Sequence, residues 1–437
     1  MTGGDSAHQP ELAGSAYLRL VVLGGLVGIP AGLVAALFLG FVHDLEHWLW
    51  TDLPDALGES SPPWYLVLGL PVVGASLVAA ARLLLPGDGG HPPLEGLHAG
   101  IVPVSHAPGI ALAAIGTLAF GAVLGPEAPV VALGAAVAIA VTWFARLGER
   151  ESTVLATAGS FSAISALFGG PLVGGVLLVE SGLGLGVALL PALLPGFVAA
   201  AVGYLIFVGF GDWGGLDTPG LVVPDLPLYE GTHLLDLLVA IAVGVATAAI
   251  IVAINRLATR LEGEGDSRLG MVSFLIAGGL AVGLIALVAD GLGTVSQDVL
   301  FSGQASIPAL IAETSTGVVL LLIVAKALAY AISLACGFRG GPIFPAIFLG
   351  IALATLPVVW FDVSPTLAIA VGAAAGTAAQ TRLLLSSMLL ATLLVGSQGL
   401  DAVPAAVLAA AAAWIARTAL DQRHGPKSPY RDAQAAA

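Results

Sequence analysis

The sequence predicts an all-α protein that crosses a membrane many times and has no soluble domain of any size. Of its 437 residues, 58% are hydrophobic and only 10% are charged. A typical soluble domain carries about 25% charged residues. So few charges cannot cover a water-facing surface, and most of the outer surface must therefore face lipid. The 58 glycines fit this class, because small residues let helix backbones approach closely inside a bilayer.

Long apolar segments mark the expected membrane spans, since a helix needs about 20 apolar residues to cross a bilayer. The candidate spans lie near residues 17–42, 64–85, 108–124, 128–145, 186–210, 234–258, 269–291, 316–336, 344–360 and 403–419. Shorter pieces, too short or too broken to cross alone, lie at 92–100, 153–168, 171–183, 304–313, 365–378 and 383–395. Irregular backbone at membrane depth is tolerated only where protein buries it or where it lines a cavity. These breaks therefore favour a transport site, and kinked structural helices are the alternative.

The distribution of Lys and Arg predicts the orientation. Basic residues gather near 146–150, near 256–268 and in the tail at 423–431, and we expect these segments to be cytoplasmic. The loops 44–59 and 212–230 carry several carboxylates and neither Lys nor Arg. Both loops should therefore lie outside the cell, in a protein of the plasma or inner membrane.

The second acidic loop divides the chain into two halves of similar size. The expected organisation is a disordered lead at 1–16, a first membrane half at 17–212, an extracellular loop at 213–233, a second half at 234–421 and a cytoplasmic tail at 422–437. Each half begins with long spans and then breaks into short pieces. Each half also carries a glycine-rich helix start. This architecture predicts an inverted repeat with a site between the halves.

Composition and motifs exclude several functions. The net charge of −14 has the wrong sign for a nucleic-acid partner. Cys336 is the only cysteine and lies in an apolar stretch, so we expect a buried inert thiol and no disulfide. His91 and His98 flank a Gly/Pro turn and are interpreted as boundary residues rather than metal ligands. Neither a nucleotide-binding G-x-x-x-x-G-K-[ST] motif nor an H-E-x-x-H motif occurs. We expect no cofactor, no metal and no enzymatic activity.

Glu127 is the most informative charge inside an apolar segment, where an ionisable side chain costs at least ~2.5–3.5 kcal/mol. It follows Gly125 and Pro126 and opens the apolar run 130–141, so free N–H groups and the positive end of a helix dipole lie beside it. One interpretation is a carboxylate in an anion site that a permeating anion could replace. The other is a helix cap worth about 0.5–2 kcal/mol.

The remaining buried charges are interpreted as structural. Arg339 and Arg382 are expected to pair with carbonyl groups at helix ends rather than to bind an anion. Lys326 could equally extend its ammonium group to the membrane surface. The second helix start, at 340–345, offers the amides of Ile343 and Phe344 to the same interior as Glu127.

At these residues the sequence resembles the CLC family of chloride channels and proton–chloride antiporters. The family motif G-[RK]-E-G-P is matched by G-P-E-A-P at 125–129, and G-G-x-F-x-P by G-G-P-I-F-P at 340–345. The motif G-S-G-I-P-x-x-E-G survives as G-D-G-G-H-P-P-L-E-G at 87–96. Residues 159–180, which end in Glu180, follow the pattern of a further helix pair. Order and spacing agree from about residue 17 to 421.

The resemblance implies two inverted halves with many tilted and half-spanning helices, assembled as a homodimer with one anion pathway per subunit. Glu127 falls on the family's gating glutamate, whose side chain blocks the outer site until it is protonated or displaced. The backbone amides expected to bind the anion are those of Gly125, Ala128, Ile343 and Phe344.

Four departures from the family pattern bear on mechanism. Gly89, with Asp88 beside it, holds the place of the serine that binds the central anion. Pro342 removes one backbone N–H that normally reaches the anion. Tyr430 is the candidate for the tyrosine at the inner end of the pathway. Ser181 replaces the proton-handling glutamate that directly follows the position of Glu180, which is structural in the family.

The expected function is transport of chloride or a similar small anion, gated by Glu127 and weakly coupled or uncoupled to protons. A strict proton–anion antiporter is the nearest alternative, and it would need Glu180 or a water chain in place of the missing carboxylate. A cation transporter would need intramembrane carboxylate pairs, and a membrane scaffold would not need broken helices.

Overall fold

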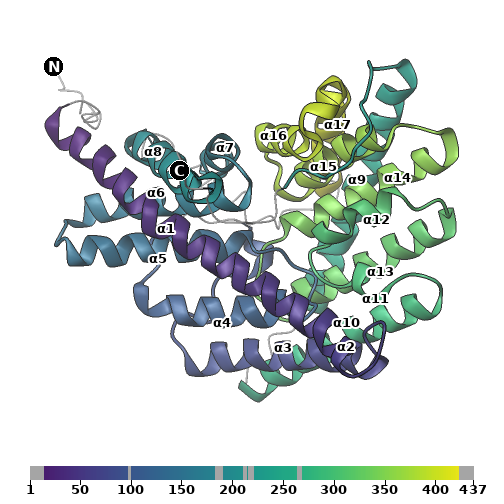
Figure 1. Cartoon of the computed structure of the whole chain (residues 1–437), viewed down its shortest axis with the longest axis horizontal. Coiled ribbons are helices and arrows are strands. Elements are labelled where there is room, and N and C mark those ends of the chain that lie inside the picture. Colours follow the sequence, from purple (N-terminus) through teal and green to yellow (C-terminus); the bar gives the residue numbers. More distant parts are fainter. Residues whose placement is uncertain are drawn as a thin grey trace.

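The structure is a computed structural model, and it describes residues 14–96, 100–182, 190–209, 214, 221–262 and 268–422. Within these ranges helices joined by turns and irregular segments make up the chain, and one isolated β-bridge joins Gly125 and Gly341. The predicted class, an all-α polytopic membrane protein, is confirmed. In Figure 1 the purple-to-teal first half and the green-to-yellow second half lie side by side.

The first half begins with a long helix and contains several short ones. Its helices are α1 (Ser15–His47), continued by a π-helical turn (Trp48–Asp52) and α2 (Leu53–Ala56), then α3 (Trp64–Leu84), α4 (Ala107–Leu118), α5 (Glu127–Phe144), α6 (Glu149–Leu167), α7 (Pro171–Ser181) and α8 (Leu190–Val208). Short 3-10 turns at Pro93–Glu95 and Val104–His106 connect α3 to α4.

The second half has the same succession of long and short helices. It comprises α9 (Leu234–Leu261), α10 (Arg268–Gly291), α11 (Ser296–Val299), α12 (Ile307–Ile311), α13 (Thr316–Ala335), α14 (Ile343–Phe361), α15 (Pro365–Thr381), α16 (Leu384–Val395) and α17 (Val403–Gln422). A 3-10 segment, Gly396–Ala402, joins the last two helices.

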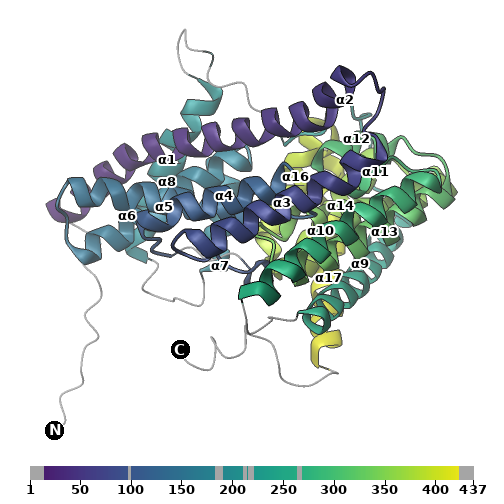
Figure 2. The same cartoon turned by 90° about the horizontal axis from the view of Figure 1, so that it is seen from below.

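The packing of the two halves repeats element by element. In the first half α1 packs on α5, α6 and α8, and α6 packs on α5, α7 and α8; in the second half α9 packs on α14, α15 and α17, and α15 packs on α14, α16 and α17. The halves meet along α3 and α10, which run beside each other (Figure 2). This correspondence agrees with the repeat that the sequence predicts.

Helices long and apolar enough to cross a membrane number nine among the described residues. One sequence expectation was wrong in detail. The segment 108–124 was expected to span, but its helix α4 ends at Leu118, and the chain continues without helix toward Glu127. The segment 153–168, expected not to cross alone, lies in α6, which has 19 residues but is not among these nine candidate spans. Its serines and alanines pack against α1, α5 and α8.

The end of the acidic loop, residues 221–233, packs on the second half. The amides of Val223 and Tyr229 donate to the carbonyls of Leu394 and Gln398 at 2.9 Å each. The Tyr229 hydroxyl donates to the Asp236 carboxylate at 2.6 Å. Burial, together with this hydrogen bond, raises the pKa of Tyr229, so the hydroxyl stays protonated and fixes the loop on the start of α9.

Candidate functional site

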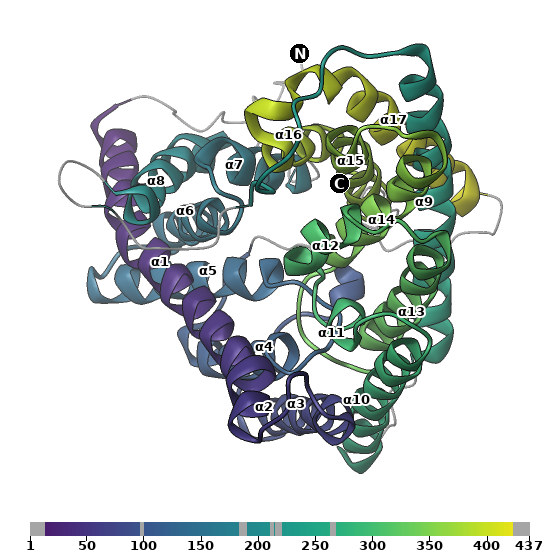
Figure 3. The same ribbon diagram turned by 45° about the vertical axis from the view of Figure 1, so that its right-hand side comes forward.

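Two helix starts from opposite halves meet in the interior of the protein. The Gly125 amide donates to the Gly341 carbonyl at 2.7 Å, and the Gly341 amide donates to the Gly125 carbonyl at 2.6 Å. This antiparallel pairing places the N-termini of α5 and α14 together, although they are distant in sequence. Figure 3 shows both helices directed into the centre of the molecule. Positive helix ends and free N–H groups therefore converge on one region.

Glu127 lies at this junction and is fully buried, with 0% exposure. Its Oε1 accepts a hydrogen bond from the Ile343 amide at 2.5 Å, and the amides of Phe344 and of Glu127 itself also interact with the carboxylate. The other oxygen, Oε2, has no hydrogen-bond partner within the described part of the chain. A buried carboxylate with an unused oxygen is costly, which is a feature of functional sites more than of helix caps.

Glycines make room for the Glu127 side chain. A Cβ atom added at Gly125 would overlap Oε2 of Glu127, and one added at Gly341 would overlap its Cδ. The glycine-rich motifs are therefore required by the close approach of the two helix starts to the carboxylate.

The four amides predicted to bind an anion are not equivalent. Those of Ile343 and Phe344 face the Glu127 carboxylate. The Gly125 amide is not available, because it donates to Gly341; this expectation was wrong, since the sequence gives no sign of the pairing. Ala128 lines a small cavity beside the first turn of α5.

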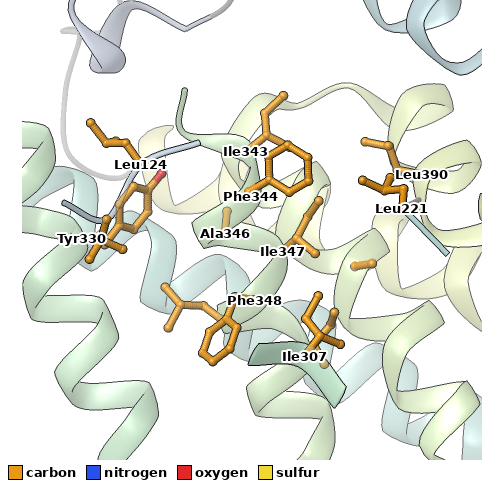
Figure 4. Close-up of a cluster of buried hydrophobic side chains, with 14 of the residues drawn as sticks. Leu124, Leu221, Ile307, Tyr330, Ile343, Phe344, Ala346, Ile347, Phe348 and Leu390 are labelled. Atoms are coloured by element: carbon orange, nitrogen blue, oxygen red, sulfur yellow. The ribbon is translucent and has the colours of Figure 1, made fainter. Parts of the chain in front are cut away.

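Aromatic side chains from α13 and from the end of α6 close the site. The Tyr330 hydroxyl donates to the Pro342 carbonyl at 2.7 Å. The ring of Phe344 stacks on Phe168 with a centroid distance of 5.6 Å. Figure 4 shows Tyr330 on one side of Ile343 and Phe344, within a cluster of buried apolar side chains. Sequence reasoning missed Tyr330, because an isolated tyrosine in an apolar helix carries no motif.

The cavity beside α5 has a volume of about 20 Å³, which is room for about one water molecule. Its lining includes Gly89, Ile110, Ala128, Arg339 and Gly340. Gly89 thus lies at the cavity, where the resemblance places the central anion. Its φ of +70° is in the left-handed region that favours glycine.

Asp88, next to Gly89, bridges two buried arginines. Its Oδ1 accepts from Arg82 Nε at 2.8 Å, and its Oδ2 forms an ion pair with Arg339. Arg339 Nε also donates to the Asp88 carbonyl at 3.0 Å. Arg339 therefore contacts a carbonyl of a turn rather than of a helix end, together with a carboxylate that was not anticipated. Sequence reasoning missed Arg82, because a basic residue in the last turn of a helix is common and belongs to no motif.

Glu180 caps a helix in the second half. Its carboxylate accepts from the amides of Leu385 and Ser386 at 3.0 and 2.8 Å and from the Ser386 hydroxyl at 2.8 Å, at the start of α16. This is the contact that a structural role requires. Ser181, beside it, donates its hydroxyl to the Leu178 carbonyl at 3.0 Å.

The other two predicted structural charges need correction. Arg382 pairs with the carboxylate of Asp421 rather than with a carbonyl, and Arg417 donates to the Ala379 carbonyl at 3.0 Å. Lys326 does not extend to the membrane surface: it is 0% exposed, and Nζ donates to the carbonyls of Asp298 and Leu300 at 3.0 and 2.5 Å. These carbonyls lie at the end of the short helix α11, which packs on α13. The sequence gives no indication of this contact.

Of three other residues singled out in the sequence, one can be placed. Cys336 is buried and free. Tyr430 and His98 lie outside the described residues. Within the described ranges no group of three or more His, Cys, Asp or Glu side chains could hold a metal.

A polytopic helical membrane protein with two repeated halves, whose broken helix starts meet at a buried carboxylate, belongs to the class of ion-transport proteins. The family model described as "Voltage gated chloride channel" matches residues 93–417, and the chain belongs to this family, the CLC family.

Curated relatives and solved structures agree with this assignment. "Putative ion-transport protein YfeO" of Escherichia coli (strain SMS-3-5 / SECEC) is 33% identical over 340 residues, which cover 75% of this chain and 76% of that protein. YfeO of Escherichia fergusonii is similar at the same identity and coverage. These two relatives are ion-transport proteins by name.

Two solved structures share the fold at lower identity. A slow cyanobacterial Cl⁻/H⁺ antiporter has a TM-score of 0.71 at 16% identity, with 92% of this chain and 95% of the other covered. A CLC-type fluoride/proton antiporter has a TM-score of 0.64 at 19% identity, with 92% and 96% covered.

Proposed function

We propose that this protein carries chloride or a similar small anion across the cell membrane, along a pathway that the Glu127 carboxylate closes. Family membership gives the class of substrate. The observation that carries the gating role is the hydrogen bond from the Ile343 amide to Glu127 Oε1. A negatively charged side-chain group there occupies the place in which a helix N-terminus would hold a free anion.

The proposed gate works by competition for the same donors. In its charged form Glu127 accepts from the amides at the start of α14 and excludes an anion from them. Protonation removes the negative charge and weakens these charge-assisted hydrogen bonds. An anion that arrives at the helix start can then take the Ile343 and Phe344 amides.

Weak or absent proton coupling is the second part of the proposal. Proton movement across the membrane interior needs titratable groups or ordered water at each end of the route. Ser181 stands where the family's antiporters carry a glutamate, and a hydroxyl does not titrate near neutral pH. Both oxygens of Glu180 are engaged by the start of α16, so this neighbour is a poor substitute. The alternative remains a strict antiporter that uses a water file to reach Glu127.

The remaining features follow the family. We propose a homodimer with one pathway in each subunit, located in the plasma or inner membrane.

The test of the gate is anion flux through purified protein in liposomes. Glu127→Gln should raise chloride flux several-fold at neutral pH and flatten its pH dependence, because the amide side chain is a permanently neutral analogue of the protonated acid. Glu59→Gln, which neutralises an exposed loop carboxylate, is the matched control and should leave both unchanged. Identical flux and pH profile in wild type and Glu127→Gln would reduce Glu127 to a helix cap.

A further inference from the structure

Arg339 lines the small cavity and forms with Arg82 and Asp88 a cluster that has one net positive charge. The side chains of Arg82 and Arg339 are 11% and 5% exposed, whereas that of Asp88 is 55% exposed. A buried guanidinium group needs compensation by anions or acceptors. One carboxylate shared between two arginines leaves that compensation incomplete.

Arg339 lines this cavity and has unused hydrogen-bonding capacity. Its Nε and Nη2 atoms contact the carbonyl and carboxylate of Asp88. No hydrogen bond of its third nitrogen, Nη1, is found among the described residues. The side chain lines the cavity together with Gly340 and Ala128, and the latter belongs to the first turn of α5, whose N–H groups have no helical acceptor.

We propose that Arg339 is a direct ligand of the transported anion in this cavity, and that Asp88 is the counter-ion that competes with the anion for it. This inference rests on the proposed function and assigns a residue outside the family motifs to the binding of the substrate. Arg339 would supply the donor that a serine hydroxyl supplies elsewhere in the family.

The backbone explains why a serine is absent. A Cβ atom at Gly89 would lie 2.8 Å from the Cβ of Ala113 on α4, and 3.4 Å from Cγ of both Arg339 and Arg82. No side chain fits there without displacement of α4 or of the two arginines. The same close approach that excludes a side chain at Gly89 packs the stem of Arg339 against the loop.

Other charges near Arg339 do not replace the anion. Glu95 interacts electrostatically with Arg339, but of the two carboxylates Asp88 is the one that contacts the guanidinium group directly. Glu127 directs its carboxylate to the Ile343 amide on α14. Asp88 is thus the acceptor that an anion must outcompete.

The proposal predicts opposite changes in chloride affinity for two variants. Calorimetric titration of the purified protein in detergent with sodium chloride measures this affinity, and chloride flux in liposomes is measured in parallel. Arg339→Gln removes the ligand and should weaken chloride binding about tenfold, the size of a lost charge-assisted hydrogen bond. Asp88→Asn removes the competitor and should tighten chloride binding several-fold and slow release.

A purely structural ion pair predicts a different pattern. Both substitutions break the same Arg339–Asp88 contact, so equal shifts in the same direction would overturn the proposal. Arg382→Gln, which breaks the ion pair with Asp421, is the matched control and should leave chloride affinity unchanged. Arg339→Lys serves if Arg339→Gln does not purify as a monodisperse protein. This variant keeps the charge and loses the fork of donors, so it should show a smaller loss of chloride affinity. Wild-type chloride affinity in Arg339→Lys would contradict the proposal.

Failure of this inference is distinguishable from failure of the proposed function. Chloride flux that responds to Glu127→Gln, with unchanged chloride affinity in Arg339→Gln, would overturn the role of Arg339 alone. Absence of anion flux through the wild-type protein would instead overturn the proposed function.

Discussion

At the scale of single residues, the buried charges of this protein are satisfied in different ways. Glu180 and Lys326 each use their polar atoms on the ends of helices from another part of the chain. Glu127 instead keeps one carboxylate oxygen unpartnered within the described structure. The proposed gating role of Glu127 requires this difference, because a gate must be able to exchange its hydrogen-bond partners.

Lys326 should contribute to stability and not to the anion pathway. Lys326→Met leaves the carbonyls of Asp298 and Leu300 without their donor, each at a cost of about 1–3 kcal/mol, offset in part because no buried ammonium remains to be desolvated. We expect a net loss of about 2 kcal/mol in the free energy of unfolding. Thermal unfolding in detergent measures it, with the exposed Arg260→Gln as the control. A wild-type unfolding temperature for Lys326→Met would show that the two carbonyls find water instead.

A carboxylate placed at the position of Ser181 tests the inner end of a proton route. Ser181→Glu should create or strengthen proton coupling if the rest of the route is intact. Chloride and proton fluxes are followed together in sealed liposomes. Glu180→Gln is the neighbouring control: it should weaken the cap of α16 by about 0.5–2 kcal/mol and leave coupling unchanged. Equal coupling in Ser181→Glu and wild type would locate the barrier to protons elsewhere.

At the scale of elements, glycines set how closely the helices approach. In α1, a Cβ atom at Gly28 would lie 2.5 Å from the Ala199 carbonyl oxygen of α8, whereas one at Gly40 would meet nothing within 4 Å. Lipid supplies no hydrophobic drive between helices, so such close packing provides much of their association.

The same substitution at these two glycines should therefore have opposite effects. Gly28→Ala forces α1 and α8 apart and should destabilise the protein by about 1–3 kcal/mol. Gly40→Ala gains helix propensity and should be neutral or stabilising by up to about 1 kcal/mol. Thermal unfolding of the two variants in one detergent decides between them. Equal destabilisation would mean that glycine at both sites serves another purpose.

At the scale of the whole molecule, the orientation in the membrane follows from the Lys/Arg distribution. Positions 150 and 260 should be cytoplasmic, and positions 52 and 225 should be outside. Single cysteines at these positions, in a Cys336→Ala background, are labelled in intact cells with an impermeant thiol reagent. Labelling from outside at position 260 would contradict this topology.

Coupling is also a property of the whole pathway. We expect chloride to leave sealed liposomes down its gradient, at clamped potential, without a fixed ratio of protons. The external pH is the measurement. Uphill proton entry in constant proportion to chloride exit would establish the strict antiporter instead.

The sequence by itself determined the membrane class and most of the spans, and it singled out Glu127 as the candidate gate. These features depend on composition and on local patterns: runs of apolar residues, glycine before a helix, and a carboxylate at a helix start. Local patterns also predicted that the amides of Ile343 and Phe344 would face the same interior as Glu127, since both helix starts carry glycine and proline before an apolar run.

The tertiary structure alone decided which of these groups meet. The apolar segment 108–124 was predicted to be a membrane span, but the helix ends at Leu118. The buried irregular segment that follows is as apolar as a helix in lipid, so hydropathy cannot distinguish the two. The engagement of the Gly125 amide by Gly341 and the contact of Asp88 with Arg339, 251 residues apart, leave no periodic trace in the chain. Contacts of this kind depend on how the two halves pack, and close packing of whole helices is not encoded in any short segment.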